Sequence, residues 1–77
     1  MSMIITTVQR LYEKNQAARQ NTYLVPKISF DGFVRDELCT VKSVDDVCTI
    51  VRHMDGNFYD LTPDQLKNFK CVGDCNC

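Results

Sequence analysis

Apolar residues near the start of the chain recur at the spacing of an α-helix. They stand at Ile4, Ile5, Val8, Leu11 and Tyr12, positions that share one helical face. Polar and charged side chains occupy the other side, Ser2 is a suitable N-cap, and the weak helix formers Asn21 and Thr22 mark the end. The pattern predicts one amphipathic helix over residues 3–20.

From Tyr23 onward the hydrophobic pattern changes to that of an extended chain. Val25, Ile28 and Phe30 alternate with other residues, and Pro26 has no N–H to donate to a sheet. We therefore expect an edge strand here. The Asp-Gly pair that follows at 31–32 is a turn signal and begins a loop.

The middle of the chain predicts two successive β-hairpins. Runs rich in β-branched residues at 38–44 and 47–53 flank Asp45 and Asp46, which is typical of a first hairpin. Met54, Asp55 and Gly56 then supply a three-residue loop with glycine in the left-handed position. A second hairpin should follow directly.

The pairing register of the second hairpin can be chosen on physical grounds. The three-residue loop places Val51 beside Tyr59 and Thr49 beside Leu61, which separates apolar from charged side chains. The alternative, a loop at residues 55–56 alone, would bury the Arg52 guanidinium among apolar residues with no evident partner. The first register leaves four residues on the outward face of the hairpin, Ile50, Arg52, Phe58 and Asp60.

The end of the sheet is predicted from a capping signal. Thr62 is a capping residue and Pro63 suits the first position of a helix, so a short helical turn should follow with Leu66 and Phe69 facing inward. A chain of 77 residues leaves room for one domain. We expect an α+β fold over residues 1–70, with an N-terminal helix packed on a small, bent antiparallel sheet of four to five strands. Residues 71–77 then form a cysteine-rich C-terminal tail.

Residues 33–69, which include the segment DGNFYDLTPDQL, resemble a small SH3-like β-barrel. Short β-branched strands joined by tight turns carry this resemblance, which covers about half of the chain and rests on no chemical motif. Members of that class mostly bind peptides, other proteins or nucleic acid. The resemblance therefore implies an SH3-like sheet over residues 23–69 and a binding module rather than an enzyme.

Composition and charge narrow the surroundings in which this domain works. Nine Lys and Arg against ten Asp and Glu give a net charge of -1, without the basic excess of a protein that binds phosphate backbones. No apolar run approaches the roughly 20 residues that span a bilayer, and the N-terminus lacks a signal-peptide pattern. Five cysteines form an odd set, which favours reduced thiols and a cytoplasmic location.

The cysteines at the C-terminus raise the question of a metal. Cys71, Cys75 and Cys77 offer three thiols as C-x3-C-x-C, whereas a structural zinc site needs four ligands. The fourth would have to be Cys39, Cys48 or His53. The alternative, which we favour slightly, is a frayed and reduced tail. Cys39 and Cys48 lie in predicted strands, where a free cysteine usually behaves as a small buried hydrophobe.

No residue pattern indicates catalysis. His53 is the only histidine, and no serine or cysteine nucleophile with an orienting acid can be inferred from its spacing. The carboxylates fall mostly in turns, where Asp bonds its own backbone. We expect no enzyme and no required cofactor.

We expect instead a small intracellular adaptor or inhibitor that binds another protein or a second copy of itself. The candidate surface is the outward face of the second hairpin, where an aromatic and an aliphatic residue stand beside a charge pair at Ile50, Arg52, Phe58 and Asp60. The alternative, which we favour somewhat, is that the N-terminal helix covers this face. By analogy of size, such a protein resembles the accessory proteins with which phages and mobile elements modulate host enzymes.

Two other functions remain open at this point. One is a thiol-rich zinc-binding protein, built on the cysteine cluster described above. The other is a barrel that binds single-stranded nucleic acid. In that case the aromatic side chains would stack on bases and the basic ones would meet phosphates, a set made up of Phe30, Phe33, Phe58, Tyr59, Lys27, Arg35, Lys42 and Arg52.

Overall fold

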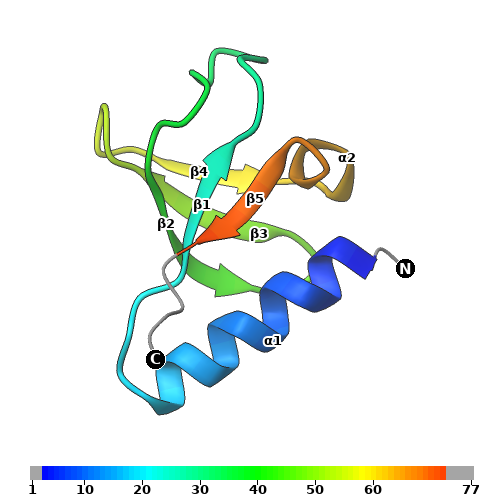
Figure 1. The fold of residues 1–77 in the computed structure, drawn as a ribbon, viewed down its shortest axis with the longest axis vertical. Coiled ribbons are helices and arrows are strands. Elements are labelled where there is room, and N and C mark those ends of the chain that lie inside the picture. Colours follow the sequence, from blue (N-terminus) through cyan, green and yellow to red (C-terminus); the bar gives the residue numbers. More distant parts are fainter. Residues whose placement is uncertain (1–2, 73–77) are drawn as a thin grey trace.

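The computed structural model describes residues 3–72, and the side chains of residues 6–72. One long helix precedes a five-stranded antiparallel sheet of order β4-β3-β2-β1-β5 (Figure 1). The elements are α1 (Met3–Ala17), β1 (Tyr23–Pro26), β2 (Cys39–Val44), β3 (Cys48–Arg52), β4 (Phe58–Leu61), α2 (Pro63–Leu66) and β5 (Phe69–Val72). The expected α+β class, with an N-terminal helix on a small antiparallel sheet, is confirmed. The sheet is not closed, because β4 and β5 form its two edges.

Helix α1 ends a few residues before the predicted boundary. Arg19 has φ 60°, a left-handed conformation that terminates a helix. One turn earlier the buried Asn15 side chain donates to the Thr22 hydroxyl at 2.8 Å and to the Asn21 carbonyl at 3.2 Å. A buried amide needs such partners, and these bonds tie the helix to the start of β1. Neither described helix is long and apolar enough to cross a bilayer.

Strand β1 is central, so the prediction of an edge strand was wrong. It pairs with β5 along its whole length and with β2 only at Tyr23 and Leu24. The N–H of Lys27 donates to the carbonyl of Asn68, which directly precedes β5. Backbone N–H groups point alternately to the two neighbouring strands. The missing N–H of Pro26 therefore falls on the β2 side, beyond the point where β2 pairing has ended. Proline is tolerated there for the reason that admits it at sheet edges.

The first hairpin is confirmed, whereas the register of the second was wrong. Strands β2 and β3 pair with a bulge between Val41 and Ser43. Strands β3 and β4 pair Val51 with Phe58, one residue away from the predicted register. The loop spans residues 53–56 instead of three residues. It closes with the Arg52 N–H donating to the Asn57 carbonyl at 3.0 Å and the Gly56 N–H donating to the Arg52 carbonyl at 2.7 Å.

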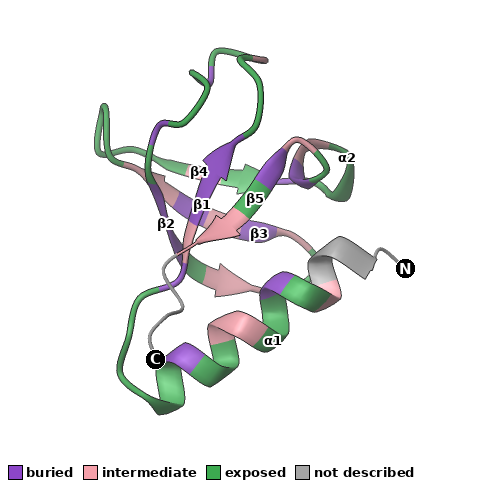
Figure 2. Ribbon diagram, viewed as in Figure 1, coloured by how far each residue is buried: buried purple, intermediate pink, exposed green. Residues whose placement is uncertain are grey.

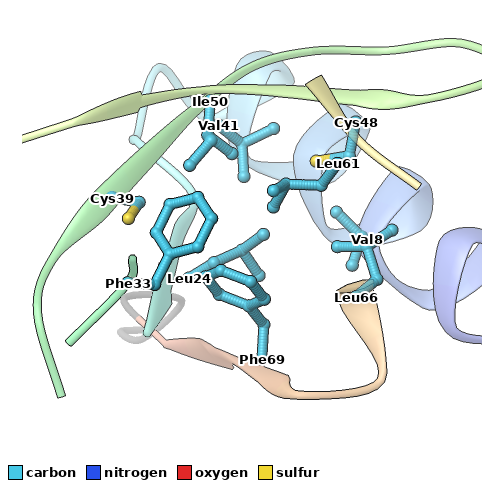
Figure 3. Packing of buried hydrophobic residues seen from close by; sticks show 10 residues of the cluster. All are labelled: Val8, Leu24, Phe33, Cys39, Val41, Cys48, Ile50, Leu61, Leu66 and Phe69. Atoms are coloured by element: carbon cyan, nitrogen blue, oxygen red, sulfur yellow. The ribbon is translucent and has the colours of Figure 1, made fainter. Parts of the chain in front are cut away.

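The hydrophobic core lies inside the bent sheet and is closed by the two helices. In Figure 1, β1 and β5 cross in front of β3 and β4, and the core residues in Figure 3 come from both halves. The buried hydrophobic cluster consists of Val8, Leu24, Phe33, Cys39, Val41, Cys48, Ile50, Leu61, Leu66 and Phe69. Figure 2 shows this burial beside the exposed outer sides of α1 and α2.

The turn after β4 follows the prediction, but the chain then returns to the sheet. Thr62 and Gln65 form a capping box around α2, Pro63 opens the helix, and Leu66 and Phe69 are buried. Phe69 belongs to β5, a strand that sequence analysis did not predict. Because β5 continues to Val72, the expected boundary of a tail at residue 71 was wrong. The remainder of the expected tail lies outside the described residues.

Candidate functional site on the second hairpin

The structure divides the four predicted surface residues between the two sides of the sheet. Ile50 is fully buried in the core, and Arg52 lies on the same side of β3. Phe58 and Asp60 are exposed on the outer side of β4. The prediction that all four share one face was therefore wrong. The cause is the one-residue change in register, which moves every side chain of a strand to the opposite face.

Arg52 on the inner side has the partner that the sequence did not reveal. Its Nε donates to Glu37 Oε1 at 2.6 Å, and the two side chains are only 14% and 3% exposed. A second guanidinium nitrogen donates to the Gly32 carbonyl at 2.7 Å, and the guanidinium carbon lies 5.3 Å from the ring centroid of Phe33. The hydrogen bond with Glu37 raises the pKa of Arg52 above its ordinary value. These contacts hold the 27–38 loop to the second hairpin.

Glu37 is itself held in place. Its other oxygen accepts the N–H of Val34 at 2.6 Å, so both carboxylate oxygens have donors. A buried carboxylate is stable only when it is paired and hydrogen-bonded in this way. The only signal of this role in the sequence is the Arg-Asp-Glu run at 35–37, which is equally typical of an exposed loop.

Asp55 fixes the hairpin turn through a second set of bonds. Its two carboxylate oxygens accept the Tyr59 hydroxyl at 2.6 Å and the Asn57 N–H at 2.9 Å. The Tyr59 hydroxyl is the largest cause of a lowered pKa at Asp55, and the Asn57 N–H adds to it. Arg52 lies 3.6 Å from the same carboxylate. The turn that presents Phe58 is therefore cross-linked to both strands.

The outer side of the sheet carries a row of cross-strand neighbours. Phe58 pairs with Val51, Val51 with Thr40, and Thr40 with Tyr23. An antiparallel sheet with one free side usually shows polar residues there, whereas three of these four are aromatic or aliphatic. Phe58 has 66% of its surface exposed. Helix α1 does not cover Phe58, because α1 packs on the core, β2 and α2. The alternative that we favoured, in which this helix covers the outward face of the second hairpin, was therefore wrong.

His53 stands beside this row and contacts two of its residues. It is exposed in the turn, its Nε2 is hydrogen-bonded to the Thr40 hydroxyl, and its ring meets Tyr23 edge-on with centroids 6.3 Å apart. This agrees with the prediction that it is a turn residue. It is not joined to a cysteine or a carboxylate in the described part of the chain.

The cysteines within the described residues are not gathered into a metal site. Cys39 and Cys48 are fully buried, as predicted, and burial raises the pKa of Cys39 to about 11 and of Cys48 to about 12. Cys71 lies half-buried in β5, and Cys75 and Cys77 fall outside the described residues. Between residues 3 and 72, no three His, Cys, Asp or Glu side chains are grouped to hold a metal ion.

A cavity of about 260 Å³ lies between α1, α2 and the β1–β5 pair. Its walls are mostly apolar, with Lys27 and Thr7 as the polar members; the full lining is Thr7, Val8, Leu24, Lys27, Leu66, Phe69 and Cys71. Several of these residues are core residues. The cavity is thus an extension of the core toward the surface, where few polar groups converge to orient a ligand.

The aromatic residues proposed for nucleic-acid stacking do not form an exposed row. Phe33 is buried, and its ring packs against those of Phe30, Phe69 and Tyr59 with centroids 5.3–5.6 Å apart. Phe58 points away on the outer side. A stacking platform needs exposed rings along one groove, and the described residues do not form one.

The residues that organise this site were only partly accessible to sequence reasoning. Phe58 and Asp60 were identified, whereas Glu37 and the bond between Asp55 and Tyr59 were not, because each depends on a register or a loop path that a linear pattern leaves open. Comparison with protein-family models, with curated proteins and with solved structures found no match for this chain.

Proposed function

We propose that this chain is a protein-binding module without catalytic chemistry, and that it binds through the outer side of the β3–β4 hairpin. The observation that carries the proposal is the exposure of Phe58, 66% of whose surface is free in a domain with a small core. Such a domain gains stability by burying its large apolar side chains, and of those that are exposed within residues 6–72 Phe58 is the most exposed. Aromatic side chains of this kind anchor many protein interfaces.

The contacts beneath the hairpin support the same proposal. The bonds of Arg52 to Glu37 and Gly32, and of Asp55 to Tyr59, hold the turn and the neighbouring loop in one arrangement. A surface that is already ordered loses less conformational entropy on binding. The hairpin therefore suits a contact surface more than a flexible loop would.

We propose as well that the domain is SH3-like. Its support is the set of five short antiparallel strands, the tight hairpin turns and the helical turn between β4 and β5. We also propose a cytoplasmic location, which rests on the cysteine usage. The proposed role as a phage or mobile-element accessory protein rests on the size of the chain.

A pull-down under reducing conditions tests the proposal. The full chain, its Phe58→Ala variant and an Ile28→Ala control are used as bait in nuclease-treated lysate of the source cell or its host. Ile28 is a suitable control because it is also exposed and apolar, at 52%, but stands in the 27–38 loop. We expect a stoichiometric protein with wild type and Ile28→Ala and a loss with Phe58→Ala. Retention of the same protein by Phe58→Ala, or of none by wild type, would contradict the proposal.

A further inference from the structure

Strand β4 is an edge of the sheet, and the direction of its backbone groups can be worked out. Arg52 donates its N–H to Asn57, so these two residues form a hydrogen-bonded pair. Such pairs alternate with non-hydrogen-bonded pairs along an antiparallel ladder. The Val51–Phe58 and Thr49–Asp60 pairs are therefore non-hydrogen-bonded pairs. The N–H and C=O groups of Phe58 and Asp60 point away from β3.

The neighbouring strands confirm this alternation. The His53 N–H donates to Leu38 on the β2 side of β3, one residue after Arg52 has donated to the β4 side. Within residues 3–72, no backbone hydrogen bond is formed at the free edge by the N–H or C=O of Phe58 or Asp60. Unpaired edges of this kind are templates for another strand, and proteins usually protect them with short strand length, charged side chains, proline, a bulge or a covering segment. Strand β4, with the sequence FYDL, has no lysine, proline or bulge, and its own protection is its length of four residues and the carboxylate of Asp60.

The charge beside this edge is negative and only partly neutralised. Asp55 has Arg52 at 3.6 Å, and Asp64 has Lys67 at 3.6 Å. The exposed Asp60 accepts a hydrogen bond from the Thr49 hydroxyl at 2.7 Å, and no cation within residues 3–72 forms an ion pair with it. An exposed carboxylate thus stands two residues from an exposed phenylalanine, on the same side of the same edge strand.

We propose that β4 binds an extended segment of a partner protein as an additional strand, with a Lys or Arg of that segment beside Asp60 and an apolar residue beside Phe58. This inference rests on the proposed protein-binding function and gives it a mode. Main-chain hydrogen bonds to Phe58 and Asp60 would supply affinity, and the two side chains would supply selectivity. Side chains on one face of a strand are two residues apart, so the partner segment carries its basic and apolar residues at that spacing.

A second copy of the chain fits the same edge less well. Two β4 strands side by side would bring the Asp60 carboxylates of both copies, which no cation within residues 3–72 pairs, into one region, and like charges close together on paired strands are destabilising. A basic segment meets this edge with opposite charge and loses no such energy.

Selection of peptides on the full chain tests the proposal. The probe is a random dodecapeptide library displayed on phage and selected at low salt against the wild-type protein. We expect enriched sequences with an apolar residue two positions from Lys or Arg. Asp60→Asn should weaken their binding by about two- to fivefold, as for an exposed ion pair, and Phe58→Ala by about tenfold or more. Asp64→Asn is the matched control and should leave it unchanged.

Methylation of backbone amides distinguishes strand addition from other contacts with the same residues. Synthetic versions of an enriched peptide are N-methylated at alternate positions. Only the series whose amides face β4 should lose binding, because in a strand every second N–H points to a given neighbour. Equal loss in both series, enrichment without the basic–apolar spacing, no enrichment, or self-association of the wild-type chain through β4 would each overturn the inference. If the pull-down still retains a protein through Phe58, the binding function stands and only strand addition fails.

Discussion

Replacing Phe58 by alanine should destabilise the domain only slightly, whereas replacing Phe69 by alanine should destabilise it strongly. A fully buried phenylalanine contributes about 1.5–3 kcal/mol through removal of apolar surface from water. Because 66% of Phe58 is exposed, only about a third of this burial free energy contributes to stability. We therefore expect a loss of about 0.5–1 kcal/mol. Phe69 is 4% exposed and packs edge-on against Phe30 and Phe33. Its truncation should cost about 3–5 kcal/mol, a large part of the stability of a small domain.

Urea denaturation followed by circular dichroism measures both losses in one experiment. The urea midpoint for Phe58→Ala should shift slightly at unchanged slope, and the midpoint for Phe69→Ala should fall several times as far. A loss above about 2 kcal/mol for Phe58→Ala would refute the reasoning, because it would mean that Phe58 packs in the core. The binding proposal would then lose the exposed anchor on which it depends.

Three further predictions follow from the core and the titrating groups. Leu66→Ala should cost about 3 kcal/mol or more by urea denaturation, since Leu66 is fully buried and lines a cavity that its truncation enlarges. Tyr59→Phe should raise the pKa of Asp55, measured by NMR titration. A lowered pKa stabilises the fold above the ordinary value of 3.8 and ceases to do so as the pH falls through the folded value, so the variant should be less stable than wild type at neutral pH and equally stable in strong acid. Cys39 and Cys48, with a pKa of about 11 and about 12 against 9.0 unfolded, should resist iodoacetamide in the folded protein, and their contribution to stability should fall as the pH rises above 9.

Elements set by local signals were predicted well, and those set by distant partners were not. The helix, both hairpins and the capped turn at Thr62 each carry their signal within a few residues. Strand β5 has no such signal, because Phe69–Val72 is short and becomes a strand only by pairing with β1. The wrong prediction of an edge strand at Pro26 has a related cause. Proline lacks a backbone N–H, but the sequence does not show which neighbouring strand that N–H would have faced.

The error in the second hairpin shows how one non-local contact determines the site. The sequence favours a register that leaves Arg52 exposed, because it shows no partner for a buried guanidinium. The structure supplies that partner in Glu37, fifteen residues earlier, at the end of a loop that folds back over β3. Once Glu37 neutralises the guanidinium, the register that buries Arg52 is no longer penalised. Since neighbouring residues on a strand alternate between faces, this register turns Ile50 and Arg52 inward and leaves Phe58 and Asp60 outside. The outer surface proposed to bind a partner therefore lacks Ile50 and Arg52, and the ion pair on the opposite side of the sheet accounts for that.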